Sequence, residues 1–449
     1  MKILGIETSC DETAAAVVCD GVEILSNVVV SQIDIFAEYG GVIPEVAARS
    51  HLEVILPVID RALSDAGCTW EDIDAIAVTH APGLLGSLLI GTLTARTLAI
   101  LHDKPLYAVH HLKSHVYANW LGVGEVEPIL SSAGLEFSST SYAGPRAEPS
   151  LRDEPVRAVR NIRVENSNQN FMLQKEQVST SPTFPLLALV ISGGHTQILW
   201  MPGHNQFEIV GTTRDDAVGE CFDKVAKILG LPYPGGPSIA KAAADGDADK
   251  YKLPHPKIEG LDFSFSGLKT AVLRAVQKEV GVPISYPSHK LAELLSPQQV
   301  ADFAASFQKT AVEILYEKVV KALEKYPEVQ SIVIAGGVSA NEELRKRFEI
   351  AFSSAGLEFS STSYAGPRAE PSLRDEPVWA VRNIRVENSN QYTLQKKQFP
   401  NLLVCFPLSS LSGDNGAMVA AACYFEIQAG VKPTDPYKLN IYPRISIEN

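Results

Sequence analysis

Cysteine is scarce in this chain and is not arranged for covalent or metal chemistry. Six cysteines are scattered over 449 residues, and no two of them form a CxxC pair. This pattern argues against a disulfide framework and against a zinc site built from thiolates. The first residues also run directly into an apolar segment too short for the core of a signal peptide. We therefore expect a cytoplasmic protein in a reducing environment.

A long uninterrupted apolar run is also missing. Residues 84–101 come closest to the ~20 residues that a membrane span needs. This segment carries Arg96 near its middle and several hydroxyl side chains. We therefore predict a buried helix here and no association with a membrane.

Basic residues are fewer than acidic ones. The chain has 39 Lys and Arg against 52 Asp and Glu, a formal net charge of −13. A general nucleic-acid coat protein draws its affinity from a basic surface, so this class is disfavoured. An enzyme acting on a specific RNA remains open if it has a local basic strip or a basic partner.

Two near-identical segments interrupt the chain. Residues 131–169 and 353–391 agree at 38 of 39 positions and differ only at Arg157 and Trp379. Architectural repeats keep an apolar pattern but vary at polar positions, so identity at polar positions indicates a copied insertion. Both copies are rich in Pro, Ser, Arg and Glu, which is typical of disorder. We predict disordered insertions over residues 128–180 and 353–398; a binding arm that uses the arginines is the alternative.

The rest of the chain alternates strand and helix patterns. A chain of 449 residues exceeds the roughly 250–300 residues of a single core, so two lobes are expected. Three apolar strand segments followed by alternating helices and strands occur twice, which predicts two similar α/β lobes around a cleft. We assign residues 1–127 to the first lobe, residues 181–352 to the second, and residues 399–449 to the end of the second lobe.

Three glycine-containing or polar turns follow predicted strands. Residues 7–13 read ETSCDET, residues 191–196 read ISGGHT, and residues 334–341 read IAGGVSAN. Adjacent glycines allow backbone N–H groups to point at phosphate oxygens, and a helix start favours an anion. One such turn is usually only a turn. Three in corresponding places favour a nucleotide-binding cleft.

His111 and His115 form an HxxxH pair. On a helix, positions i and i+4 share one face, so the two imidazoles could supply half of a metal site. The Glu of an HExxH metalloprotease is absent, which argues against that class. We take Asp414, at a predicted helix start, as the best candidate for a third ligand; an ordinary helix cap is the alternative.

Two further segments have the composition of a site. Asp216, Glu220 and Asp223 fall near one face of a predicted helix, although a solvated acidic face would look the same. Residues 233–238, YPGGPS, predict a rigid turn that could close over a ribose, or a plain loop.

Taken together, these motifs resemble one known family. They are IETSCDET (6–13), HAPGLLGSLLIG (80–91), the HxxxH pair, VISGGHTQ (190–197), the segment 219–239, FSFSGLKTAV (263–272), IAGGVSAN (334–341) and GDNGAM (413–418). In this order they strongly resemble the tRNA adenosine threonylcarbamoyltransferase family, once described as glycoprotease-like. Both insertions fall between its motifs.

The resemblance implies an α/β fold of two actin-like lobes, of the sugar-kinase and heat-shock-ATPase type, around a central cleft. It implies transfer of the threonylcarbamoyl group from threonylcarbamoyl-AMP to N6 of adenosine 37, in tRNAs reading codons that begin with A. The implied metal ligands are His111, His115 and Asp414, holding one divalent ion per subunit, with iron(II) preferred and zinc as the alternative. The implied substrate contacts are Val190, Ile191, Ser192, Gly193, Gly194, Asp223, Gly236 and Asn341.

The resemblance also implies partners: tRNA, a paralogous actin-like subunit and a small ATPase subunit. As a hypothesis, Asp11 or Glu12 on the first turn assists removal of a proton from the attacking amine. Two alternatives stay open at this stage, namely an actin-like ATPase or kinase acting as a nucleotide switch, and a degraded, inactive copy.

The sequence departs from the family pattern in three motifs. Lys113 and Ser114 stand where the family usually has Glu and a small residue, which puts support of the metal in question. Ala240 stands where an acid is frequent, and Ser412-Gly413 replaces Cys-Thr before Asp414.

Overall fold

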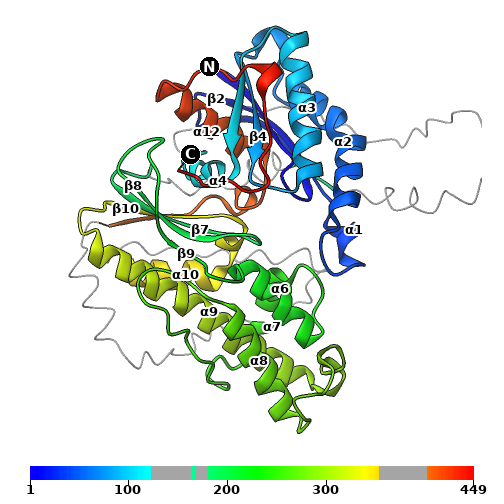
Figure 1. The fold of residues 1–449 in the computed structure, drawn as a ribbon, viewed down its shortest axis with the longest axis vertical. Coiled ribbons are helices and arrows are strands. Elements are labelled where there is room, and N and C mark those ends of the chain that lie inside the picture. The colour runs from blue at the N-terminus through cyan, green and yellow to red at the C-terminus, as the bar shows by residue number, and fades with distance from the viewer. Residues whose placement is uncertain (123–162, 167–180, 353–401, 449) are drawn as a thin grey trace, which may run out of the picture.

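The chain folds into two α/β lobes, one above the other in Figure 1. The computed structural model describes residues 1–122, 163–166, 181–352 and 402–448. Each lobe is built on one sheet with helices packed against it. Two of the three apolar clusters belong to single lobes, and the third joins both.

The first lobe contains a six-stranded sheet in the order β5-β4-β1-β2-β3-β6. Its strands are β1 (Lys2–Glu7), β2 (Glu12–Cys19), β3 (Glu23–Ser31), β4 (Ala75–Ala81), β5 (Leu106–His110) and β6 (Arg163–Asn166). β1, β2 and β3 form an antiparallel meander, and β4 and β5 join β1 in parallel. β1 and β2 are buried along nearly their whole length, which matches their near-continuous apolar sequences.

The second lobe repeats this topology. Its sheet has the order β11-β10-β7-β8-β9, made of β7 (Leu186–Ile191), β8 (Thr196–Met201), β9 (Glu208–Thr212), β10 (Ser331–Ala335) and β11 (Leu403–Cys405). Again three strands form a meander, and two further strands join the first strand in parallel. The correspondence confirms two similar actin-like lobes.

The helices of the first lobe are α1 (Ile33–Ala37), α2 (Pro44–Asp65), α3 (Leu85–Leu101) and α4 (His111–Tyr117). Proline stands at the first position of α2, where its missing N–H costs nothing. The prediction of a helix over residues 84–101 is confirmed by α3, but its burial is only partial: one face packs on β4 and α2, whereas Leu85, Leu89 and Leu93 are exposed. Within the described residues, no helix combines the length and apolarity that crossing a bilayer requires.

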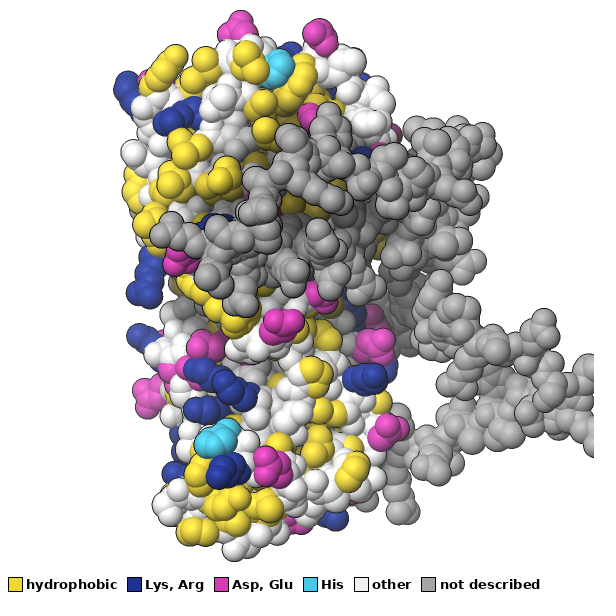
Figure 2. Space-filling view, turned by 90° about the vertical axis from the view of Figure 1, so that its right-hand side faces the viewer, with side chains coloured by type: hydrophobic (Ala, Val, Ile, Leu, Met, Phe, Trp, Pro, Cys, Tyr) yellow, Lys and Arg dark blue, Asp and Glu magenta, His cyan; other side chains and the backbone are white. Residues whose placement is uncertain are grey.

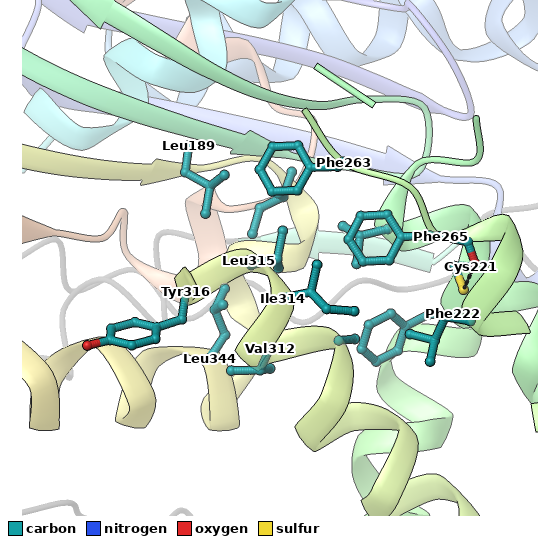
Figure 3. Packing of buried hydrophobic residues seen from close by; sticks show 14 of the residues in the cluster. Leu189, Cys221, Phe222, Phe263, Phe265, Val312, Ile314, Leu315, Tyr316 and Leu344 are labelled. Carbon is teal, nitrogen blue, oxygen red and sulfur yellow. Dashed lines mark hydrogen bonds between the residues drawn. The ribbon is translucent and has the colours of Figure 1, made fainter. Parts of the chain in front are cut away.

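The later helices are α6 (Val218–Leu229), α7 (Gly235–Ala243), α8 (Ser266–Glu279), α9 (Pro297–Lys325), α10 (Glu342–Phe352) and α12 (Gly416–Gln428). Short 3-10 helices are η1 (Trp70–Asp72), η2 (Ala118–Trp120), η4 (Ser288–Lys290), η5 (Ala292–Leu294), η6 (Gly337–Ala340), η7 (Ser409–Leu411) and η8 (Pro436–Lys438). Figure 3 shows the core of the second lobe, where Phe222, Phe263 and Phe265 meet Ile314 and Leu315 of α9. This core holds α6 and α9 rigidly beside the second sheet.

The end of the chain does not belong to the second lobe alone, so this boundary was wrong. β11 completes the second sheet, but α12 packs against β1 and β2 of the first sheet and against α4. The physical reason is its composition, because a helix that is apolar on every side must be buried all around. A Cβ on Gly5 of β1 would lie closer than 3.0 Å to the α12 backbone, so the absence of a side chain allows this close approach.

Two other expectations need correction. Arg163–Asn166, inside the first insertion, form β6 and pair antiparallel with β3, so disorder is the wrong prediction for these four residues. The remaining residues of the first copy and the whole second copy lie outside the described residues. The expected rigid turn over residues 233–238 is the start of α7, which begins at Gly235 after Pro234.

Candidate metal centre and nucleotide turns

Three side chains from distant parts of the chain meet at one point of the first lobe. His111 and His115 lie one turn apart on α4, and Asp414 lies just before α12. The Nε2 atoms of the two histidines lie 3.6 and 3.1 Å from Asp414 Oδ1. One ligand atom from each residue lies within 4.8 Å of the others, which is close enough for the three side chains to share one ion.

The chemistry of these side chains fits a divalent ion. Among the described residues, neither ring nitrogen of His115 makes a hydrogen bond of normal geometry, although only 1% of this residue is exposed. A buried imidazole without a well-formed hydrogen bond is costly, and coordination of a cation by Nε2, which lies 3.1 Å from Asp414 Oδ1, would satisfy that atom. Two neutral imidazoles and a carboxylate are a common ligand set for iron and zinc.

The electrostatics around the triad depend on the proximity of opposite charges. Burial opposes a charge on His111, but the neighbouring Asp414 and Glu7 outweigh it and raise the His111 pKa to about 9. Burial likewise opposes a charge on Asp414, but His111 and His115 lower its pKa to about 2. A bound cation would take the place of the proton on His111, because a ligand must be deprotonated.

Glu7, at the end of β1, supports His111 from behind. Glu7 Oε2 lies 3.2 Å from His111 Nδ1 and accepts a hydrogen bond of 2.6 Å from the Thr79 hydroxyl. The backbone N–H of Ser9 donates to Glu7 Oε1, so this buried carboxylate is held by three groups. A carboxylate on Nδ1 fixes the tautomer that presents Nε2 to the ion. Sequence reasoning missed this role, although an acid ending a wholly apolar strand was a visible signal.

His195 reaches the same region from the second lobe. Its pKa falls to about 4, first through burial and then through the positive charge of His111 and His115. The ring is therefore neutral at physiological pH and electrostatically coupled to the triad. Sequence reasoning placed this residue within the glycine turn but assigned it no role.

Asp11 and Glu12, in the turn after β1 and at the start of β2, have raised pKa values and feel the charge of Asp414. Burial, with the charge of Asp414 adding to it, raises the pKa of Asp11. Burial followed by the charges of Asp11 and Asp414 holds the pKa of Glu12 well above its usual range. The Ser31 hydroxyl lies 3.3 Å from Glu12 Oε1. A carboxylate that is made more basic in this way suits proton transfer.

The two glycine turns of the second lobe lie side by side. β7 and β10 are parallel neighbours with Val190 opposite Ala335, so the turns that follow them emerge at the same edge. Val190 and Ile191 are buried in β7, whereas Ser192, Gly193 and Gly194 form the following turn. A Cβ on either Gly193 or Gly194 would meet no atom within 4 Å, so a ligand can approach this backbone closely.

Two of the other three expected substrate contacts, Asp223 and Asn341, make hydrogen bonds within the protein. Asp223 Oδ1 accepts a 2.7 Å hydrogen bond from the N–H of Gly235, and the charge of Asp11 adds to burial in raising the Asp223 pKa. Gly236 has open space where a Cβ would be. Asn341 caps α10, because its Oδ1 accepts from the N–H of Leu344 while its Nδ2 donates to Gln308. Contacts of these three residues with substrate stay a prediction.

Lys113 is accommodated away from the metal ligands. Its ammonium lies 3.8 Å from Glu426 of α12, 3.3 Å from Asn205 Oδ1 and 5.4 Å from the centre of the Phe207 ring. Two positions along a helix from His111, the side chain points to a different face. Lys113 therefore joins α4 to α12 and to the β8–β9 hairpin, and it leaves the triad geometry intact.

The fold and the site define a class: a two-lobed actin-like protein with a candidate His-His-Asp metal site on the first lobe and a pair of glycine turns on the second. Comparison with known proteins refines this class. The family model described as tRNA N6-adenosine threonylcarbamoyltransferase matches residues 23–134 and 166–368. This chain belongs to that family and is a transferase.

Curated relatives carry the same description. A protein from Symbiobacterium thermophilum is 40% identical over 431 residues, covering 96% of this chain and 93% of the relative. One from Dehalococcoides mccartyi is 45% identical over 348 residues, covering 77% of this chain and 84% of the relative. Both are named tRNA N6-adenosine threonylcarbamoyltransferase.

Solved structures show weaker likeness. The ROK hexokinase of Thermus thermophilus is 13% identical with a TM-score of 0.38, covering 96% of this chain and 100% of the hexokinase. YeaZ from Pseudomonas aeruginosa is 25% identical with a TM-score of 0.19, covering 25% of this chain and 46% of YeaZ. The actin-like assignment therefore rests on the matching topology of the two sheets.

Proposed function

We propose that this chain transfers the threonylcarbamoyl group from threonylcarbamoyl-AMP to N6 of adenosine 37, in tRNAs reading codons that begin with A. Membership of the family carries this proposal, and the triad supports it, because His111, His115 and Asp414 meet within 4.8 Å. The intact triad favours an active enzyme over a degraded copy. Neither family membership nor the triad favours the ATPase or kinase alternative.

The donor is a mixed carbamic–phosphoric anhydride, so the protein needs no nucleophile of its own. The backbone N–H groups of the turn at Ser192–Gly194 and the helix start after Gly336 would hold the AMP part. A divalent ion on the triad, iron(II) by preference or zinc, would supply Lewis acidity at the threonylcarbamoyl end. Glu7 keeps His111 oriented, which is the contribution of the first sheet.

The transfer step exchanges one bond for another. The N6 amine of adenosine attacks the carbamoyl carbon, the C–O bond to phosphate breaks, and AMP leaves with the electron pair. The amine loses one proton, and Asp11 or Glu12 would accept it, since both carboxylates have raised pKa values and feel the charge of Asp414. Adenosine must leave its stack to reach these groups, which a tRNA loop allows more readily than a duplex.

Partner subunits are part of the proposal, because a net charge of −13 is unsuited to tRNA capture by this chain alone. The neighbouring helices α2 and α3 expose a leucine face, and Figure 2 shows hydrophobic side chains gathered on the first lobe. The leucines of this face are Leu52, Leu56, Leu85, Leu89 and Leu93, which are 38–66% exposed. Exposed apolar patches of this kind mark protein interfaces, so a paralogous actin-like subunit would dock here. A small ATPase subunit and a cytoplasmic location complete the proposal.

A reconstituted reaction tests the function. The purified chain is combined with its partner subunits, threonylcarbamoyl-AMP and unmodified tRNA, and nucleosides are then analysed for threonylcarbamoyl adenosine. We expect product with the wild-type chain and none with His111→Ala. Product formed equally well by His111→Ala, or ATP hydrolysis by the isolated chain with no product from the complete mixture, would refute the assignment.

A further inference from the structure

Arg345 on α10 is a side chain that the proposed mechanism does not use, yet it lies between its two parts. The guanidinium makes three directed hydrogen bonds: Nε donates to the carbonyl of Ser339 at 2.8 Å, and Nη2 donates to the carbonyl of Pro407 at 2.8 Å and to the hydroxyl of Ser412 at 3.3 Å. Its central carbon also lies 4.9 Å from the centre of the Phe406 ring. Burial lowers its pKa, but an arginine stays charged under these conditions.

The segments that Arg345 joins serve different ligands. Ser339 belongs to η6, the turn after β10 that lies beside the turn after β7 and would hold adenylate. Pro407 and Ser412 flank η7, and the chain continues from Ser412 through one residue to Asp414 of the metal triad. One planar cation therefore ties the adenylate turn to the segment that presents a metal ligand.

We propose that Arg345 is a positioning residue that couples adenylate binding to metal binding. The inference rests on the proposed function, because it takes the turn and the triad as the two ligand sites. A nucleotide that orders η6 also fixes the Arg345 guanidinium, and the fixed guanidinium in turn orders the segment that leads to Asp414. Binding of the second ligand therefore costs less conformational entropy. The same coupling acts in both directions, as linkage requires.

The geometry explains why lysine could not replace this arginine. The guanidinium holds donors at fixed angles and reaches the Ser339 and Pro407 carbonyls at the same time, whereas an ammonium is a compact point charge without that rigid fork. An Arg345→Lys variant therefore keeps the charge but loses the simultaneous connection.

Arg347, two residues further along α10, provides a matched control. It makes two hydrogen bonds to Glu313 of α9, at 2.6 and 3.0 Å, and lies over the Tyr316 ring at 3.4 Å. It thus binds the core side of the helix. Arg347→Lys removes a comparable set of contacts without touching the two turns.

The test measures cobalt(II) binding to the full-length, metal-free chain by calorimetry, without and with saturating AMP. In the wild type and in Arg347→Lys, AMP should raise cobalt affinity about fivefold or more, the usual lower range of coupling between sites. In Arg345→Lys the effect should fall below about twofold, while near-UV circular dichroism stays native. An equal AMP effect in Arg345→Lys and the wild type would overturn the inference.

Two further outcomes are informative. A wild-type chain that binds neither cobalt nor AMP would contradict the proposed function, whereas one that binds both independently would contradict the coupling alone. Should Arg345→Lys fail to fold, Ser412→Ala takes its place, because it removes the 3.3 Å bond to the guanidinium together with the 3.4 Å bond that the hydroxyl donates to the Leu408 carbonyl. It should reduce the AMP effect by about half, and an unchanged effect would again overturn the inference.

Discussion

Replacing Glu7 by glutamine is the most informative single change at the metal centre. Oε1 of Glu7 accepts from the Ser9 N–H, and Oε2 accepts from the Thr79 hydroxyl and lies against His111 Nδ1. A glutamine of the same size has only one acceptor oxygen, so either rotamer of its amide points an NH₂ group at a donor. The variant also removes the buried negative charge behind His111.

The expected magnitude follows from this role. Loss of a carboxylate behind a ligating histidine typically reduces metal affinity about 10–100-fold, or roughly 1.4–2.8 kcal/mol. Titration of metal-free Glu7→Gln with cobalt(II) measures this loss directly. Activity should fall in parallel at limiting metal and partly recover at excess metal.

A matched control separates this effect from general damage. Asp215, in the second lobe, also accepts three hydrogen bonds, from the Ser264 hydroxyl and from the N–H groups of Phe265 and Ser266. Asp215→Asn should lower stability and leave cobalt affinity unchanged. Equal cobalt affinity in Glu7→Gln and the wild type would refute the argument that this carboxylate orients His111.

Three further predictions follow from the contacts around α4, α12 and the second sheet. In the wild type, the Lys113 ammonium lies 3.8 Å from the Glu426 carboxylate, and Lys113→Glu would put two acids there, so it should destabilise the fold by about 1–3 kcal/mol. The double variant Lys113→Glu/Glu426→Lys should recover at least half of this loss in urea denaturation. No recovery would show that the two charges do not interact. Burial, opposed by Lys113, raises the Glu426 pKa from 4.5 to about 7, so the folded chain binds this proton more tightly than the unfolded chain. The stabilisation from this group is therefore fully present below pH 4.5 and is lost as the pH rises through about 7, by up to roughly 3 kcal/mol. Glu426→Gln should abolish this fall in the free energy of unfolding between pH 5 and pH 7.5. The same dependence of unfolding free energy on pH in both proteins would contradict the prediction. Gly336→Ala should lower stability by about 1–3 kcal/mol, because φ is +88° and a Cβ would lie closer than 3.0 Å to the Ile191 carbonyl. Gly337→Ala should be tolerated, because a Cβ there would meet no atom within 4 Å. Equal thermal unfolding temperatures of the two variants would contradict this prediction.

The helices and strands that have a regular apolar pattern could be predicted from the sequence. Alternating segments predicted the two lobes, and the apolar stretch at residues 84–101 predicted α3. The HxxxH spacing placed His111 and His115 on one face of α4 because helical spacing is local. Asp414 was the best candidate for a third ligand as a carboxylate at a predicted helix start, but no local pattern links it to α4, so its proximity to the histidines comes from the tertiary fold.

Other features depended on tertiary contacts that no spacing reveals. Glu7 reaches His111 only because β1 and the start of α4 are brought together by the parallel strands β4 and β5. α12 joins the first lobe because its apolar surface is buried between both sheets, although it follows a strand of the second. Lys113 looked like a defect beside the metal ligands until its partner Glu426 was located on α12.

The central claim is that His111, His115 and Asp414 form a single metal centre, and the metal content of the purified chain tests it most directly. Wild-type protein, loaded anaerobically with iron(II) and then desalted, should retain about one ion per chain. His115→Ala should retain almost none, whereas His204→Ala, which changes another histidine packed among aromatic rings, should bind as the wild type does. Equal iron in His115→Ala and the wild type would contradict the account.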